Sequence, residues 1–295
     1  MKQSTHDISA FRLPKPSACA SLGDPWISGE ILPAETDFPR HDALPRTGLA
    51  NRYFQVMALV LLAIVLIGFF RTLFLRPLFQ VSPIPWNVYM HGSMMTAWFV
   101  LLVVQTSLVA RHRTDLHRRF GILGAVLALA VVVAGISVTL QIPAHLKGGG
   151  TPYSGLPLPL PFWIQTMWNN IGIMTLFPVF VATALCMRRR ADVHKRLMLL
   201  ASMAMITPAA GRIRGFPEVW GFASSAPTSA LVLHILPVAI AMLLPLTLVG
   251  HDFLTARRLH RATAWGVLGI LVVDIGMGVV IPTTAVGRAL WNALE

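Results

Sequence analysis

Charged residues and cysteines are scarce in this sequence of 295 residues. Only 12% of the residues are charged, whereas about a quarter are charged in an ordinary soluble domain. The two cysteines, Cys19 and Cys186, are too few for a disulfide framework. Walker, Gly-x-Ser-x-Gly, His-Glu-x-x-His and Cys-x-x-Cys-His motifs are also absent, so nothing supports ATP hydrolysis, serine or zinc hydrolysis, or covalent haem attachment. The sequence assigns no catalytic residue.

Apolar residues make up 55% of the chain, and its mean hydropathy is +0.66. They are concentrated in nearly uncharged runs of about twenty residues, the length that a helix needs to cross about 30 Å of hydrocarbon. We therefore predict an all-α fold, a polytopic bundle of about seven transmembrane helices. The predicted spans cover residues 53–75, 86–110, 120–142, 162–187, 196–211, 228–250 and 263–283.

Two tails flank the predicted transmembrane domain, which covers residues 53–283. Residues 1–52 are rich in proline and contain equal numbers of acidic and basic residues, a composition typical of a disordered tail. They lack the apolar core and cleavage site of a signal peptide, so we expect them to remain as a cytoplasmic tail. Residues 284–295 form a short interfacial tail in this interpretation, with Trp291 as its membrane anchor.

The distribution of basic residues predicts the topology. The chain has 24 Lys and Arg against 12 acidic residues, an excess that in a soluble protein would suggest nucleic-acid binding. Half of the basic residues lie in the segments that follow the second, fourth and sixth spans. The positive-inside rule therefore predicts a bacterial inner-membrane protein with its N-terminus in the cytoplasm and its C-terminus outside. Its expected partner is the bilayer, with anionic headgroups at the cytoplasmic face, and not nucleic acid.

Histidines mark an internal repeat. His91 and His117 are 26 residues apart, and His234 and His260 have the same separation. Each pair is followed by a Gly-x-Leu-Gly step, and His194 lies at the matching point between the fourth and fifth predicted spans. We therefore predict three related helix hairpins that follow one leading helix.

A layer of polar residues is expected inside the membrane, near its outer side. His91 and His234 each lie about six residues, or about 9 Å, from the outer ends of their spans. Asn169 and Asn170 reach the same level on the fourth span. Because polar groups are costly within a bilayer, this layer is a candidate functional site. Three explanations remain open for it.

The first explanation is a non-covalent haem b in an electron-transfer protein. Two histidines at one depth can supply both axial imidazole ligands to the iron. In this hypothesis His91 and His234 bind the iron, while Arg212 and Arg214, on the outer side, pair with the propionates.

The second explanation is a proton-coupled path for a small solute. Asp274 is the only acidic residue inside a predicted span and lies near the middle of the seventh. Desolvation favours the neutral form of such a carboxyl, which can then carry a proton. Gln105, Asn169 and Asn170 would complete the path, together with the two histidines.

The third explanation is a scaffold or assembly protein without chemistry, in which the polar residues hold helices together. Glycines that allow close helix approach are frequent in the spans. We expect them at Gly121, Gly124, Gly135, Gly266, Gly269, Gly276 and Gly278. No spacing of histidines and carboxylates defines a metal site.

Three segments carry a resemblance to a known group of proteins. They are His91-Gly-Ser-Met-Met-Thr-Ala-Trp98, Asp115-Leu-His117-Arg-Arg-Phe-Gly121 and Asp192-Val-His194-Lys-Arg-Leu-Met198. With these segments the chain resembles a group of uncharacterised bacterial multi-pass membrane proteins over about residues 53–283. The group carries no assigned activity, so the resemblance implies a membrane location and no site residue.

Overall fold

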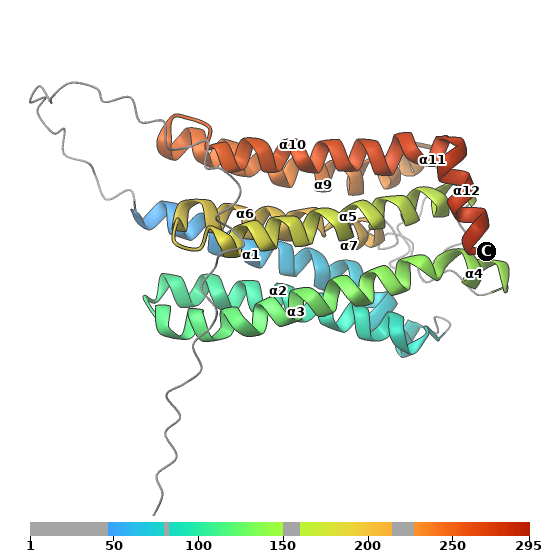
Figure 1. Ribbon diagram of the computed structural model, residues 1–295, viewed down its shortest axis with the longest axis horizontal. Coiled ribbons are helices and arrows are strands. Elements are labelled where there is room, and N and C mark those ends of the chain that lie inside the picture. Colours follow the sequence, from blue (N-terminus) through green and yellow to red (C-terminus); the bar gives the residue numbers. More distant parts are fainter. Residues whose placement is uncertain (1–46, 80–82, 150–159, 214–226) are drawn as a thin grey trace, which may run out of the picture. The chain divides into compact units, whose positions relative to one another are not determined.

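The computed structural model describes residues 47–79, 83–149, 160–213 and 227–295, which are helical and contain no strand (Figure 1). Five helical segments in these ranges are long and apolar enough to cross a membrane. They are Arg52–Phe74, Trp86–Ala110, Thr114–Lys147, Leu160–Cys186 and Arg261–Thr283. The described part of the chain is thus all-helical, with five candidate membrane-spanning helices, as expected of an integral membrane protein.

The first part of the chain supplies three of these segments. Helix α1 (Thr47–Phe69) continues into a π-helical turn, η1 (Phe70–Phe74), and a 3-10 turn, η2 (Arg76–Phe79). Helix α2 (Trp86–Ala110) packs against α1 and against α3 (Thr114–Leu140), which is followed by the short helix α4 (Ile142–Lys147). Because α1 begins at Thr47, the predicted tail boundary at residue 52 lies inside a helix. The rest of that tail lies outside the described residues.

The middle of the chain agrees in part with the prediction, in which the fifth span covers residues 196–211 and can kink at the Thr207-Pro208 step. Helix α5 (Leu160–Cys186) matches the fourth predicted span, but the fifth is divided into α6 (Ala191–Ala204) and α7 (Thr207–Ile213). The break precedes Pro208, which lacks an N–H for helix hydrogen bonding and disfavours helical backbone in the residue before it. Neither piece is among the five candidate spans. The count of seven spans therefore stays a prediction.

The last part of the chain contains two long helical segments. Helix α9 (Pro227–Ala256) encloses the sixth predicted span, and its described apolar part is Met242–Ala256. Helix α10 (Arg261–Ile275) continues through the π-helical turn η3 (Gly276–Val280) into α11 (Ile281–Thr283). Helix α12 (Ala285–Leu294) then closes the chain.

Short turns join α2 to α3, α5 to α6, and α9 to α10, and the helices of each pair pack against each other. We call the end that holds these turns the turn end, and the opposite end, where α12 packs against α4 and α5, the α12 end (Figure 1). The two ends provide the reference for placing the candidate residues along the bundle.

The surface of α3 is apolar. Ile122, Val126, Leu129 and Val133 are each more than 60% exposed. An apolar stripe of this size is unfavourable in water, whereas lipid chains solvate it well. The exposed face of α3 therefore supports a membrane location.

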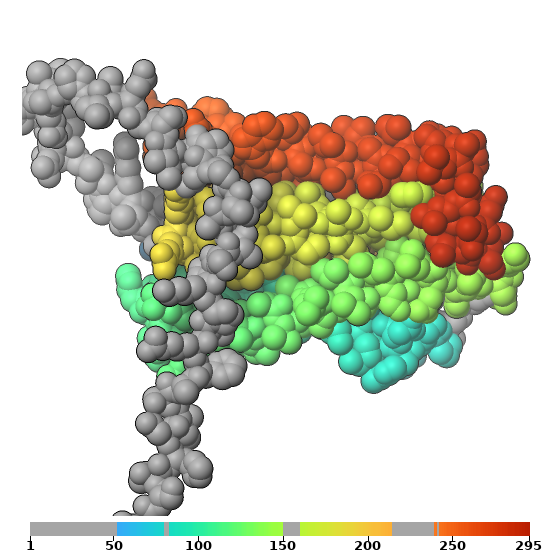
Figure 2. Space-filling model, viewed as in Figure 1, coloured from blue at the N-terminus to red at the C-terminus, as the bar shows by residue number. Residues whose placement is uncertain are grey.

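The C-terminal tail forms helix α12, which buries Gly287 and Trp291 against the bundle. Trp291 is only 1% exposed and packs in a cluster with Trp163 and Trp168. The indole of Trp168 donates a hydrogen bond to the carbonyl oxygen of Gly287, at 3.2 Å. In the space-filling view, α12 rests on the neighbouring helices (Figure 2). Trp291 thus fixes α12 to the bundle instead of reaching the lipid as the predicted anchor, and the interfacial position of the tail stays a prediction.

Candidate functional site

Asp274 lies in α10, two residues before the π-helical turn η3. Its side chain is half-buried, and among the residues that the structure describes none forms a hydrogen bond or an ion pair with its carboxyl group. π-helical turns disturb the regular backbone hydrogen bonds and are frequent at functional sites. An ionisable group beside such a turn, inside a candidate span, is therefore a candidate functional residue.

Asn169 lies next to this turn. A Cβ atom built on Gly278 would be 3.3 Å from Oδ1 of Asn169. Close contact between the two helices continues at Gly172, where a built Cβ would be 2.6 Å from Cγ1 of Val273. The structure therefore brings Asn169 of α5 to within about one helical turn of Asp274.

His91 lies on α2 and faces α3 and α5. A Cβ built on Gly135 would be 3.0 Å from Cε1 of His91 and would collide with the sulfur of Met174. The half-buried Asn170 is one turn from Met174 on the same helix. The Nδ1 atom of His91 is buried and has no hydrogen-bond partner among the described residues. His91 is therefore an inward-facing histidine at the α12 end of the bundle.

Gln105 lies at the other end of α2. Its Nε2 donates to the backbone oxygen of His117 at 3.2 Å, which ties α2 to the start of α3. Fourteen residues separate it from His91, about 21 Å along a helix. Gln105 thus lies at the turn end, far from His91.

Of the three remaining predicted site residues, the structure describes the side chain of Arg212 alone. The guanidinium group of Arg212 donates to the carbonyl oxygen of Pro208 at 2.8 Å and lies 4.7 Å from the ring centre of Phe69. It is also within electrostatic range of His91. Arg214 lies outside the described residues, and so does the side chain of His234, although α9 includes that position. The predicted pairing of His91 with His234 therefore stays a prediction.

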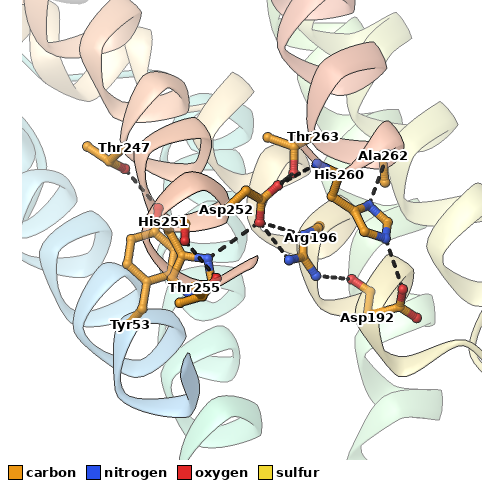
Figure 3. A network of polar contacts seen from close by, with 10 residues as sticks. All are labelled: Tyr53, Asp192, Arg196, Thr247, His251, Asp252, Thr255, His260, Ala262 and Thr263. Carbon is orange, nitrogen blue, oxygen red and sulfur yellow. Dashed lines mark hydrogen bonds and ion pairs between the residues drawn. The ribbon is translucent and has the colours of Figure 1, made fainter. Parts of the chain in front are cut away.

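A network of polar contacts lies at the turn end (Figure 3). Its centre is Asp252 of α9, which is fully buried. Oδ1 of Asp252 accepts hydrogen bonds from Nη2 and Nε of Arg196, at 2.6 and 3.1 Å. Oδ2 accepts from the hydroxyl of Thr263, at 2.5 Å, and from the backbone N–H of His260, at 3.2 Å. Four hydrogen bonds therefore compensate the carboxylate for its burial.

Asp192 extends this network on α6. Its backbone oxygen accepts from Nη1 of Arg196, at 2.9 Å, and its carboxylate contacts Nε2 of His260, also at 2.9 Å. Because Nδ1 of His260 accepts from the N–H of Ala262, the ring proton belongs on Nε2, which donates to Asp192. Burial raises the pKa of Asp192, but hydrogen bonds from His260 and from the Val193 N–H outweigh it, so the pKa is lowered. Asp192 is therefore ionised at neutral pH.

Tyr53 and His251 border the network. Their rings stack with centroids 4.3 Å apart, and the Tyr53 hydroxyl is 2.8 Å from that of Thr247. Nδ1 of His251 is 3.5 Å from Oδ1 of Asp252, which is too long for a good hydrogen bond. These contacts join α1 and α9 beside the ion pair of Arg196 and Asp252.

This network was missed from the sequence. Asp252 follows the predicted end of the sixth span at residue 250, and Arg196 was counted only among the basic residues that set the topology. The available signal was an acidic residue inside an apolar stretch, because α9 continues to Ala256. Since an isolated charge is not buried without a partner, an acid at this position indicates a basic partner on a neighbouring helix.

Comparisons with known proteins supply no assignment, because no family model, curated protein or solved structure matches this chain. Function must therefore be argued from the geometry alone.

Proposed function

We propose that the protein is a proton-coupled carrier of a small solute, with Asp274 as the group that takes up and releases the proton. The observation that carries this proposal is the half-buried position of Asp274 in a candidate span, without a counter-charge among the described residues. A carboxyl group there is neutral when it holds a proton and attracts a cation or a hydrogen-bond donor when it does not. Solute binding can therefore be linked to proton transfer.

Nearby polar residues support a path in the half of the bundle toward the α12 end. Asn169 lies close to η3, and His91 faces the interior from α2. Amide and imidazole groups can bind a polar solute as it leaves water. The Asp252 network lies at the opposite end, and its central carboxylate accepts four hydrogen bonds, so we assign the network a structural role.

The carrier is proposed to cross a bacterial inner membrane seven times, as three related hairpins after a leading helix. The turns after α2, α5 and α9 support the hairpins, and the high content of basic residues at the turn end supports a cytoplasmic location for it. Anionic headgroups at that face are the expected lipid partners. In this arrangement the α12 end faces outward.

Transport in proteoliposomes tests the proposal. Vesicles that contain a pH-sensitive dye are exposed to gradients of succinate, glutamate, phosphate or choline. At least one solute should change the internal pH faster than in protein-free vesicles. Asp274→Asn should reduce that rate about tenfold or more, because an amide cannot exchange the proton at this position.

Asp115→Asn is the matched control, because Asp115 is an exposed acid that pairs with Arg113 on the surface. It should transport like the wild type. Equal rates for the wild type and Asp274→Asn would contradict the role of Asp274. A wild type that behaves like empty vesicles with all four solutes would contradict the carrier and favour a scaffold.

A haem b protein is the second candidate, and a specific observation favours it. Nδ1 of His91 is a buried polar atom without a hydrogen-bond partner among the described residues. An imidazole whose bound metal is not present would leave a nitrogen unpartnered in this way. In this alternative His91 and His234 are the axial ligands, with Arg212 and Arg214 beside the propionates.

An absorption spectrum separates the two candidates. Protein purified in mild detergent from cells supplied with haem precursor should show a Soret band and sharp reduced α and β bands if it binds a haem through two histidines. His91→Ala should abolish the bands, and Asp274→Asn should leave them unchanged. A colourless protein that is monodisperse and transports a solute would reject the haem alternative.

A further inference from the structure

A methionine sulfur and a histidine ring meet beside Gly135 of α3. A Cβ built on Gly135 would be 3.0 Å from Cε1 of His91 and closer still to Sδ of Met174. Both atoms therefore lie within 3.0 Å of one point, although His91 comes from α2 and Met174 from α5. The absence of a side chain at Gly135 leaves room for the two groups to approach each other.

The histidine ring has an unused nitrogen at this place. Nδ1 of His91 is bonded to the Cε1 atom near Gly135, is buried, and has no hydrogen-bond partner among the described residues. Buried polar atoms normally have a partner, which can be protein, ordered water or a bound ligand. In the tautomer that carries its proton on Nε2, Nδ1 offers a lone pair. An imidazole nitrogen is thus available as a ligand atom next to a thioether sulfur.

A second methionine lies on the same face of α2. Met95 is one turn after His91, and Trp98 follows one turn later. Trp98 packs edge-on against Phe177 of α5, with ring centroids 4.9 Å apart, and Phe177 is one turn after Met174. The face of α2 that carries Met95 is therefore directed toward the face of α5 that carries Met174. Both methionines are only 8% exposed and belong to the same buried cluster.

These donor atoms favour copper in its monovalent form. Thioether sulfurs are soft ligands that select Cu(I), and imidazole also binds copper. Zn²⁺ and harder cations prefer thiolates, several imidazoles or carboxylates. The described part of the chain contains no group of three histidine, cysteine or acidic residues that could hold such an ion. Arg212, which is within electrostatic range of His91, also repels one positive charge less than two.

We propose that His91 and Met174 bind a Cu(I) ion through Nδ1 and Sδ, with the sulfur of Met95 as the third ligand. All three ligands are neutral, and binding involves no change in the oxidation state of the ion. The site does not include Asp274 and does not depend on solute transport. It uses the histidine that the haem alternative assigns to iron, so Cu(I) and haem cannot both occupy His91.

Competition with bicinchoninate, a chelator that is coloured when it holds Cu(I), tests the site. The protein is purified in mild detergent without added haem precursor and is titrated with ascorbate present and oxygen absent. Cys19→Ser and Cys186→Ser are introduced into every protein, because thiolates bind Cu(I) strongly. This parent protein should remove about one equivalent of Cu(I) from the chelator. Met174→Leu and His91→Leu should each weaken binding about tenfold or more, because a ligand is lost.

Two further variants serve as controls. Met167→Leu replaces a fully buried methionine of α5 that packs among Trp163 and Trp168, away from Gly135, and should bind Cu(I) like the parent. Met and Leu have similar volumes, so packing is conserved in both methionine variants. Asp274→Asn should also bind like the parent. A loss of transport in Asp274→Asn therefore leaves the copper site intact, and the two proposals can fail separately.

X-ray absorption at the copper edge gives a readout that a purely structural methionine would not change. The parent should show sulfur and nitrogen neighbours around copper, and Met174→Leu should show less sulfur. Met95→Leu should reduce the sulfur signal as well. A parent protein that takes up no Cu(I), or Met174→Leu and His91→Leu variants that bind it as tightly as the parent, would overturn the proposal.

Discussion

An Asp252→Ala variant is expected to lose about 3–5 kcal/mol of folding stability, because it leaves the charge of Arg196 buried without its carboxylate. Arg196 is only 7% exposed, so water cannot replace the lost partner without a local opening of the bundle. The substitution also removes the acceptor of the Thr263 hydroxyl and of the His260 N–H. The measurement is thermal unfolding in detergent, followed by tryptophan fluorescence.

Two controls show whether burial causes the effect. Asp115→Ala breaks the exposed pair with Arg113 and should change stability by less than about 1 kcal/mol. The double variant Arg196→Met with Asp252→Leu removes both charges and should recover much of the loss, since apolar residues can replace a buried ion pair. If Asp252→Ala unfolds at the wild-type temperature, the ion pair does not stabilise the fold.

The agreement of five predicted spans with candidate membrane-spanning helices follows from the physics of the bilayer. Segments such as α2 and α5 must be apolar over about twenty residues, and such runs can be recognised from composition alone. Where the apolar run is interrupted, as at Pro208, the same reasoning predicted one span and the structure has two helices, α6 and α7. The composition of a segment indicates whether it lies in lipid or in water. The exact ends of its helices depend on how it packs against neighbouring segments.

The candidate site was predicted less completely because its geometry depends on packing between distant segments. Asp274 could be recognised as an acid in an apolar run, but its place beside Asn169 depends on the contact of α5 with η3. Gln105 was assigned to the path of Asp274 because both are polar and intramembrane. In the structure it binds the backbone of His117 at the turn end.

The glycines also show that contacts between distant segments are hard to predict from the sequence. Gly135 and Gly266 lie in tight contacts, as expected, whereas no atom lies within 4 Å of a Cβ built on Gly276. Gly68 and Gly287, which were not predicted, face the backbone of other segments. Residue type shows where close approach is allowed, and only the packed structure shows where it is used.

Gly68→Ala is expected to destabilise the bundle by about 1–3 kcal/mol or more, the range for overpacking. A Cβ at this position would collide with the carbonyl oxygen of Ala209 and lie 2.8 Å from its carbonyl carbon. Both atoms belong to the backbone of α7, so no side-chain rotation relieves the contact. Helices α1 and α7 would have to separate, and thermal unfolding in detergent should report the loss.

Gly250→Ala is the matched control, because no atom lies within 4 Å of a Cβ built in α9 at that position. Its expected effect is a gain of up to about 1 kcal/mol, since alanine has the higher helix propensity. If Gly68→Ala lowers the stability and Gly250→Ala raises it, the destabilisation arises at the contact between α1 and α7. Unchanged stability in Gly68→Ala would mean that α1 and α7 do not approach as closely as the structure has them.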